Sequence, residues 1–463
     1  MFFNSYVFIF FFFPVFLLSW IALFRTRNSR WTLLLLSSCL FYAWWDFRFL
    51  ALLAYIIVIN FTAGNYIYGL ENQKTKKQVL IISIILSLLP LVVFKYLPWL
   101  GGYASVLLES ESRVAYDSLL SSIILPLGIS FFTFQALTYT IGLYNNKCSH
   151  CASIVKFSVY VSMFPQLMSG PIVRYQDLDD QLENIGDLRN KIDLKGGVEL
   201  FFIGLIKKII IADRIGMYIN PIFQPGADLS ATVAWLAVMG YSLQLYFDFS
   251  GYSDMAIGIG RCMGIKLPDN FRAPYTASNP SDFWRRWHIS LSTWLRDYLF
   301  IPLGGSWKGK VITYRNLIIT MFLAGVWHGA NWTFICWGIW HGLMLCVYRA
   351  TPAHIKKRMP VWFSVLLLNI AVLIGWTFFR TTSVEHAFEF FNAMLGFRYS
   401  AGAAIAWPIY FMIPLGYMIH YFERRISDKP VKLGWSYAVL LAGASAWAIL
   451  ELGKDAPFIY FQF

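Results

Sequence analysis

The chain has 463 residues, of which 58% are hydrophobic and only 14% are charged, and its formal net charge is +13. Soluble domains carry about 25% charged residues, so this composition excludes a soluble globular enzyme and favours a helical protein with many membrane spans. The basic residues lie in short clusters between apolar runs, which argues against nucleic-acid binding as the reason for the positive charge.

Four basic clusters set the expected topology, because loops rich in lysine and arginine stay in the cytoplasm. They read FRTRNSRW, ENQKTKKQ, HIKKRMP and FERRISDKPVK. The first apolar run, VFIFFFFPVFLLSWIALF, has no basic segment before it and no small-residue cleavage site after it. We therefore expect a retained membrane helix rather than a cleaved signal peptide, with the N-terminus outside.

Further apolar runs long enough to cross a bilayer continue along the chain. They lie near residues 31–45, 49–70, 79–97, 118–143, 197–215, 231–249, 313–349 (as a hairpin), 361–379, 404–421 and 434–452. We expect about twelve spans, both termini on the extracytoplasmic face, and the polar stretch RYQDLDDQLENIGDLRNKIDLK in the cytoplasm. Residues 1–452 are then one all-α multi-pass membrane domain, and residues 453–463 are an extracytoplasmic aromatic tail.

Two segments fit poorly as simple spans, namely FSVYVSMFPQLMSGPIVRY and SDFWRRWHISLSTWLRDYLF. The first is broken by two prolines and a glycine, and the second carries three arginines and an aspartate. Such segments are tolerated at membrane depth where protein buries them or a water-filled cavity adjoins them, which predicts a cavity open to the cytoplasm.

The second of these segments has the spacing of an amphipathic helix. The residues on its apolar face are Trp284, His288, Leu291 and Leu295. The arginines that lie off that face are Arg285, Arg286 and Arg296. Guanidinium groups are suited to holding phosphates, but an interfacial helix whose arginines meet lipid headgroups explains the same pattern.

The hairpin contains GVWHGANW, and a second WHG follows at residues 340–342. An imidazole within a membrane run is a functional hypothesis by default, and we favour that interpretation for His328. Gly325 and Gly329 allow close approach of backbones, and Asn331 can share a face with His328 and orient a substrate or the ring. For His341 we favour a hydrogen-bonded packing histidine.

Acidic and polar residues also interrupt the apolar stretch LQLYFDFSGYSDMAIGIGRCMG, which contains Asp248 and Tyr252. Buried acidic groups are costly unless they are paired or hydrated. They can line a tunnel, bind a proton or pair with a buried arginine. Six cysteines include one C-x-x-C, at Cys148 and Cys151, with no second pair, so no metal site is expected.

The motifs DFWRRWHISLSTWLRDYLFIPLGG and GVWHGANWTFICWGIWHG resemble those of the membrane-bound O-acyltransferases, specifically their bacterial alginate O-acetylase-like branch. The resemblance extends over most of the chain, including GYSDMAIGIG, LPDNFRAPY and WTFFRTTSVEHAFEFFNAMLG. It implies a shell of about 11–12 transmembrane helices around a central tunnel, with re-entrant or interfacial helices, in the bacterial cytoplasmic (inner) membrane. The histidine that this family treats as catalytic corresponds to His328, and the histidine of the first motif corresponds to His288.

This resemblance implies an O-acetyltransferase with no bound cofactor, whose donor is acetyl-CoA or another acyl thioester. His328 would act as general base, and the residues expected to contact substrates are Arg285, Arg286, Arg296, Asn331, Asp248 and Tyr252. The expected partners are a polysaccharide acceptor, membrane lipids and a separate extracytoplasmic transferase of the SGNH/GDSL type, because the chain has no G-x-S-x-G and no soluble domain. Alginate, peptidoglycan and other glycans stay open as acceptors.

The chain ends in PFIYFQF, which fits the pattern F-x-Y-x-x-F with Phe458, Tyr460 and Phe463. A similar tail occurs in bacterial systems that acylate the cell envelope. The resemblance implies that Tyr460 carries the acyl group as a phenolic ester. Packing or anchoring by the aromatic rings is the alternative.

Two other classes of function stay open. A transporter or flippase explains the many spans and the polar helix but needs no essential histidine. An acyltransferase acting directly on a lipid or protein would use His328 without Tyr460.

Overall fold

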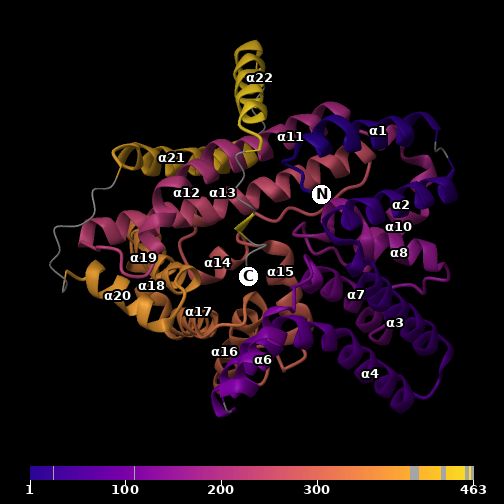
Figure 1. Cartoon of the computed structure of the whole chain (residues 1–463), viewed down its shortest axis with the longest axis horizontal. Helices are drawn as coiled ribbons and strands as arrows, with labels where there is room; N and C mark the ends of the chain where they lie inside the picture. Colours follow the sequence, from indigo (N-terminus) through magenta and orange to yellow (C-terminus); the bar gives the residue numbers. More distant parts are fainter. Residues whose placement is uncertain (24–25, 109, 397–405, 429–433, 454–457, 460–463) are drawn as a thin grey trace. The chain divides into compact units, whose positions relative to one another are not determined.

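The computed structural model describes residues 1–23, 26–108, 110–396, 406–428, 434–453 and 458–459. The described residues form α-helices with short 3₁₀ and π segments and no strand (Figure 1). The expected all-α class is therefore confirmed. The residues expected to form one domain fall into two compact units: unit 1 comprises Met1–Phe202, Tyr252–Pro268 and Leu452–Asp455, and unit 2 comprises Ile203–Gly251, Asp269–Glu451 and Ala456–Phe463.

Unit 1 contains the first half of the chain. Its elements are η1 (Phe8–Phe12), α1 (Phe13–Leu18), η2 (Ser19–Leu23), α2 (Arg27–Asp46), η3 (Phe47–Phe49), α3 (Leu50–Gly69), α4 (Gln73–Leu91), η4 (Val92–Tyr96), α5 (Leu97–Ala104), η5 (Ser105–Leu107), α6 (Ser110–Ser121), α7 (Ile129–Tyr144), α8 (Ile154–Ser162), α9 (Phe164–Leu167), α10 (Tyr175–Glu183) and η6 (Ile185–Lys191). Helices α11 (Leu194–Ile206) and α13 (Ala231–Met263) contribute residues to both units.

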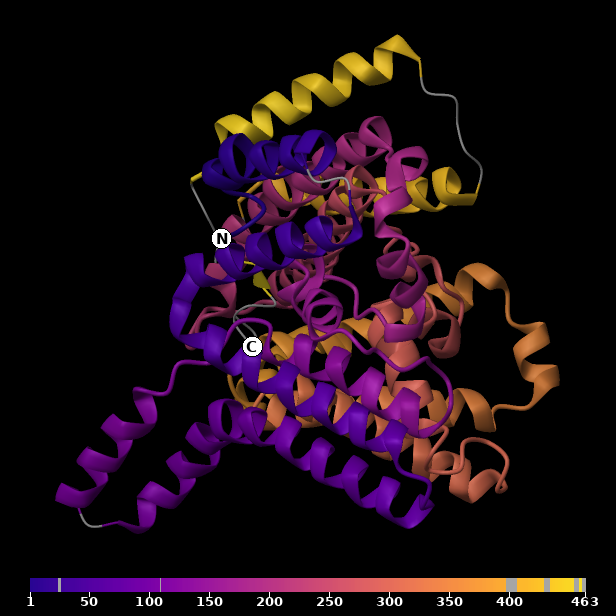
Figure 2. The same cartoon turned by 90° about the vertical axis from the view of Figure 1, so that its right-hand side faces the viewer.

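Helix α7 forms the centre of a helical layer in unit 1, where it packs beside α3 and α4 (Figures 1 and 2). Almost every residue of α7 is buried, including Gln135 and several threonines as well as its apolar residues. Gly64 of α3 lies against the ring of Tyr139, so a Cβ there would collide with that ring. The expected span over 118–143 is wrong as a single helix, because Gly128 adopts a left-handed conformation (φ 73°) and separates α6 from α7.

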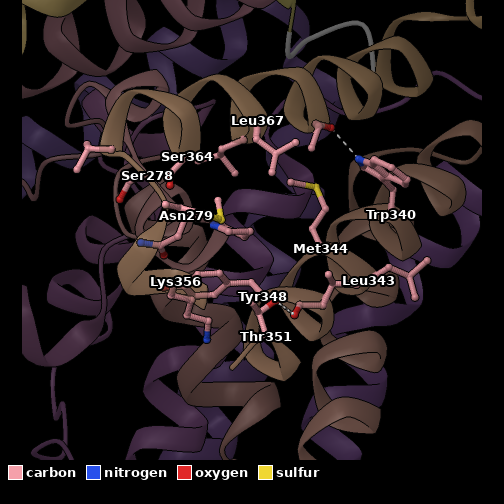
Figure 3. A pocket seen from close by; sticks show the side chains of 16 residues that line it. Ser278, Asn279, Trp340, Leu343, Met344, Tyr348, Thr351, Lys356, Ser364 and Leu367 are labelled. Carbon is pink, nitrogen blue, oxygen red and sulfur yellow. Dashed lines mark hydrogen bonds between the residues drawn. The ribbon is translucent and has the colours of Figure 1, made fainter. Parts of the chain in front are cut away.

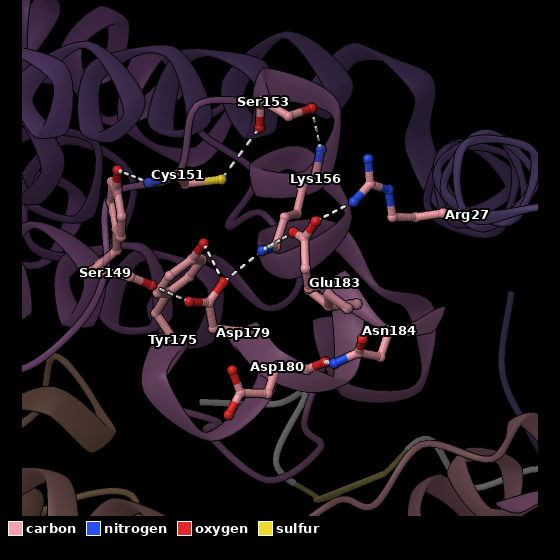
Figure 4. Close-up of polar contacts among 12 residues, drawn as sticks. Arg27, Ser149, Cys151, Ser153, Lys156, Tyr175, Asp179, Asp180, Glu183 and Asn184 are labelled. Atoms are coloured by element: carbon pink, nitrogen blue, oxygen red, sulfur yellow. Dashed lines mark hydrogen bonds and ion pairs between the residues drawn. The ribbon is translucent and has the colours of Figure 1, made fainter. Parts of the chain in front are cut away.

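In unit 1, ion pairs and hydrogen bonds connect the polar segment that begins at Arg174, which was expected in the cytoplasm, to helix α8. The stretch that begins at Arg174 folds into α10 and η6, and Lys156 of α8 forms ion pairs with Asp179 (2.6 Å) and Glu183 (2.7 Å) (Figure 4). Tyr175 donates a hydrogen bond to Asp179 (2.7 Å). Burial raises the pKa of Asp179, but hydrogen bonds from Lys156 and its neighbours outweigh this effect, and the pKa falls below its ordinary value. We call Lys156, Tyr175, Asp179 and Glu183 the polar cluster.

Unit 2 contains most of the motifs found in the sequence. Its elements are η7 (Lys207–Ala212), α12 (Asp213–Ile219), η8 (Asn220–Phe223), η9 (Pro274–Thr276), α14 (Pro280–Trp284), α15 (Ile289–Leu295), η10 (Arg296–Phe300), α16 (Lys310–His328), α17 (Trp332–Ala350), α18 (Ala353–Arg358), α19 (Val361–Arg380), α20 (Val384–Met394), α21 (Pro408–Asp428) and α22 (Trp435–Leu450).

Helices α16 and α17 form the expected hairpin and pack side by side (Figure 1). Gly325 and Gly338 face each other at the crossing, where a Cβ on Gly325 would meet the backbone oxygen of Phe334 and one on Gly338 would meet that of Met321. Gly329 lies against the ring of Phe334. The expected close approach of backbones is therefore confirmed at Gly325, whereas Gly329 makes room for a side chain.

Three segments of the described chain are helical, long and apolar enough to cross a membrane. They are Arg27–Gly69, Gln73–Leu107 and Val361–Arg380, and Phe8–Ala22 and Trp435–Leu450 are shorter apolar helices. These helices support a membrane protein. The total of about twelve spans and the orientation of the termini stay predictions.

Candidate active site

His328 is the last residue of α16, and it lies in a buried group of aromatic rings. Its ring centroid is 4.9 Å from that of Trp327, 4.8 Å from that of Trp337 and 5.1 Å from that of Phe379. These rings come from α16, α17 and α19. The side chain that the sequence favoured as the catalytic base is thus removed from bulk water, with only 5% of its surface exposed.

His341, on α17, lies in the same group of rings and is fully buried. Its ring centroid is 4.9 Å from that of Trp337 and 5.1 Å from that of Trp284, so Trp337 contacts both histidines. We call the side chains around the two histidines the aromatic chamber. Its members are Trp284, Trp327, Trp337, Trp376 and Phe379.

Several polar atoms of the aromatic chamber have no hydrogen-bond partner among the described residues. Neither ring nitrogen of His341 is hydrogen-bonded to any described residue, and the same holds for the indole nitrogens of Trp284 and Trp337. Buried polar atoms in proteins are almost always paired. The hydrogen bond expected of a packing histidine is therefore not made by His341 within the described chain, and the chamber offers both donors and acceptors to a ligand.

His288 does not lie within a continuous helix, so the predicted helical face through Trp284 and Leu295 is wrong. The helix breaks because His288 is left-handed (φ 42°, ψ 57°), a conformation that costs a non-glycine residue about 1–2 kcal/mol. Asn270 stabilises the break: its Oδ1 lies 3.1 Å from Nδ1 of His288 and accepts a hydrogen bond from the Ser290 hydroxyl (2.9 Å).

The contact with Asn270 sets the proton position on His288. An amide oxygen only accepts, so Nδ1 donates and a neutral ring keeps its lone pair on Nε2. Burial lowers the pKa of His288, which favours this neutral form. Trp327 is near both histidines: its ring centroid is 6.2 Å from that of His288 and 4.9 Å from that of His328.

The three arginines do not lie on one helix, because Arg285 and Arg286 lie in the turn after α14 and Arg296 begins η10. Arg285 follows α14 and is exposed, and Arg286 forms an ion pair with Asp282 (3.0 Å). Arg296 begins η10, pairs with Asp297 (2.6 Å) and remains largely exposed. Phosphate binding and headgroup binding are both compatible with these positions.

The remaining expected substrate contacts are dispersed. Asn331 caps α17 by accepting from the Thr333 amide (3.0 Å), and its amide group donates to the Thr382 carbonyl (2.9 Å). Tyr252 is buried in unit 1, where it stacks on Phe3 (4.8 Å). Their side chains are thus occupied by structural contacts.

The sequence left open that Asp248 pairs with a buried arginine. Asp248 does form an ion pair, but its partner is Lys208 (2.6 Å). Its second oxygen accepts a hydrogen bond from the backbone of Ile459 (2.9 Å).

Tyr460 and Phe463, which the sequence singled out, lie outside the described residues. Lys208 was not singled out from the sequence. The pattern that could have identified it is the pair of lysines within the apolar run GLIKKIIIAD.

Unit 2 also contains a mostly apolar cavity of about 450 Å³ (Figure 3). Trp340, Met344 and Leu367 lie on its wall, and Lys356 lies over the ring of Tyr348 at 4.3 Å. The residues that line this cavity do not include His328 or His341. It is therefore distinct from the aromatic chamber.

Residues 140–387 match the model of the MBOAT, membrane-bound O-acyltransferase family. The chain is 36% identical to a probable alginate O-acetylase of Pseudomonas putida over the whole of both chains. It is 37% identical to the peptidoglycan O-acetyltransferase of Helicobacter pylori (85% of this chain, 80% of that protein) and 30% identical to the teichoic acid D-alanyltransferase of Bacillus subtilis (66% and 78%). The chain therefore belongs to the membrane-bound O-acyltransferase family and is a membrane acyltransferase.

Proposed function

We propose that the protein is an O-acetyltransferase of the bacterial cytoplasmic membrane that passes acetyl groups from cytosolic acetyl-CoA to an exported or cell-envelope polysaccharide. The names of the relatives support an envelope polymer as acceptor, since they act on alginate, peptidoglycan and teichoic acid. The observation that carries the proposal is the aromatic chamber, which encloses His328 and His341 within the matched family segment.

His328 is the general base of the proposed reaction. It takes the proton of an attacking hydroxyl while that oxygen bonds to the thioester carbonyl carbon. The carbon–sulfur bond then breaks, and the leaving thiolate takes the proton from the imidazolium. The surrounding aromatic rings exclude water, which protects the thioester from hydrolysis.

Tyr460 provides the attacking hydroxyl in this proposal. A phenol is more acidic than an alcohol, so its ester is a good acetyl donor for a second transfer. A separate extracytoplasmic transferase of the SGNH/GDSL type then moves the acetyl group to the polysaccharide. Both termini are placed on the extracytoplasmic face in this scheme. Direct acylation of a partner, a lipid or the glycan itself is the second candidate, and the chamber alone favours neither.

The test is incubation of the purified protein with acetyl-labelled acetyl-CoA, followed by peptide mass analysis and measurement of released CoA. One acetyl group on Tyr460 is expected, and it should be absent from His328→Ala and Tyr460→Phe proteins. Tyr410→Phe is the matched control, because Tyr410 is an exposed tyrosine of α21. A fully active Tyr460→Phe protein would refute the carrier role and leave direct transfer.

Donor titration separates the two roles of the arginines. Arg285→Glu and Arg296→Glu should each raise the apparent KM for acetyl-CoA if the guanidinium groups hold its phosphates. An unchanged KM in both variants would assign these exposed residues to lipid headgroups.

A further inference from the structure

A charged pair, Lys208 and Asp248, is buried in unit 2. Lys208 of η7 and Asp248 of α13 are 1% and 2% exposed, and Nζ lies 2.6 Å from Oδ1. Asp213 gives Lys208 a second partner at 2.8 Å and is itself partly exposed. Replacing such a pair by apolar residues of similar volume is often neutral for stability, so its presence in this core calls for another role.

Both charged groups contact the end of the chain. The second carboxylate oxygen of Asp248 accepts a hydrogen bond from the backbone amide of Ile459 (2.9 Å). The ammonium of Lys208 lies 4.6 Å from the ring centroid of Phe458, within the range of a cation–π interaction. Consecutive residues of the tail thus engage the two members of one ion pair.

The two residues that contact the ion pair are themselves buried. Phe458 is 2% exposed and Ile459 is 7% exposed. The contact to Ile459 uses its backbone and the contact to Phe458 uses an aromatic ring. Such a site recognises a backbone amide together with an aromatic ring on the residue before it.

We propose that Lys208 and Asp248 form a docking clamp for the chain's own C-terminal segment and act as positioning residues for Tyr460. The clamp stands on the contacts of Phe458 and Ile459 alone; its role in delivering Tyr460 rests on the function proposed above. Because Ile459 is joined directly to Tyr460, a fixed Ile459 amide limits the distance over which that hydroxyl can be presented. In this proposal the clamp acts through the position of Tyr460 and takes no part in the transfer itself.

The first measurement is hydrogen exchange of the C-terminal peptide in the full-length protein. In Lys208→Met/Asp248→Leu, which leaves neither member of the pair charged, exchange at Ile459 should be about tenfold faster or more. Asp213→Asn is the matched control, because it removes a carboxylate from Lys208 without touching the tail; its exchange should equal that of the wild type. Unchanged exchange in the double variant would overturn the clamp.

A second variant, in the C-terminal segment itself, tests the clamp if the double variant does not fold. Phe458→Ala removes the ring over Lys208 and leaves the ion pair intact. It should also speed exchange at Ile459, and thermal midpoints measured in the same detergent would show that the fold persists. Wild-type exchange in Phe458→Ala would equally contradict the clamp.

The second measurement concerns positioning. In the double variant, acetylation of Tyr460 and of the polymer should fall at least tenfold in kcat, while KM for acetyl-CoA stays the same, because the donor site is untouched. Fast exchange with normal acetylation would overturn positioning and leave only an anchor. A fully active Tyr460→Phe protein would instead refute the carrier function, and the exchange measurement would still decide the clamp.

Discussion

The polar cluster of unit 1 and the aromatic chamber of unit 2 both bury polar atoms, but they differ in how these atoms are paired. In the polar cluster, Lys156 and Asp179 form an ion pair, and Tyr175 donates to the same carboxylate. In the chamber, both nitrogens of His341 lack a protein partner among the described residues. Satisfied buried groups stabilise a fold, whereas an unsatisfied buried group marks a place for bound water, an ion, a ligand or a catalytic role. The two regions therefore differ in the pairing of their buried atoms and not in burial.

The strongest test of this difference is His328→Ala. A general base contributes about 100- to 10,000-fold to a rate, so acetyl transfer should fall by that factor while the thermal midpoint stays near that of the wild type. Steady-state rates and a melting curve in the same detergent provide the comparison. Normal polymer acetylation in this variant would remove His328 from the chemistry.

Lys156→Met should show the opposite behaviour. It leaves Asp179 without its cation in a partly buried position, so the free energy of unfolding should fall by about 1.5–3 kcal/mol. The acetyl-transfer rate per folded molecule should not change. Lys357→Met, at an exposed lysine of α18, is the control that should leave both quantities unaltered. A large rate loss at wild-type stability would give the polar cluster a functional role.

His341→Ala should lower the rate by less than the roughly 100- to 10,000-fold that is expected for loss of a general base at His328. The contact of both rings with Trp337 suggests that His341 orients the substrate and does not transfer the first proton. Parallel kinetics of the two alanine variants give the ranking. A larger loss at His341 would mean that the second WHG supplies the base.

The smallest effect is the pH dependence of the polar cluster. The pKa of Asp179 is lower in the folded protein than its ordinary value, so its stabilising contribution is present above about pH 3.9 and is lost as the pH falls through the folded pKa. Asp179→Asn should therefore lose less stability than the wild type when the pH is lowered through this range. Asp187→Asn, at an exposed carboxylate nearby, should follow the wild type. Identical curves for Asp179→Asn and the wild type would contradict this assignment.

Much of this organisation is readable from local sequence patterns. Composition and short-range spacing are enough to predict the helical class, the hairpin of α16 and α17 and the close approach at Gly325. Two long motifs identify the family. The break at His288 is not readable in this way. It depends on Asn270, eighteen residues earlier, and a helical periodicity does not reveal a competing tertiary hydrogen bond.

The partner of Asp248 illustrates the same limit. An acidic residue in an apolar helix predicts a partner but does not name it. Lys208 lies on another element, and the two are joined only by tertiary packing, as is the backbone of Ile459. Likewise, nothing local to the second WHG shows that the nitrogens of His341 lack protein partners.

The packing at Gly375 restricts which residues can replace this glycine beside His341. A Cβ at that position of α19 would lie 2.8 Å from Nε2 of His341, closer than side chains tolerate. Gly375→Ala therefore adds a single methyl group directly against the imidazole while leaving its chemical identity unchanged. The size of the side chain at position 375 therefore limits where the His341 ring can lie.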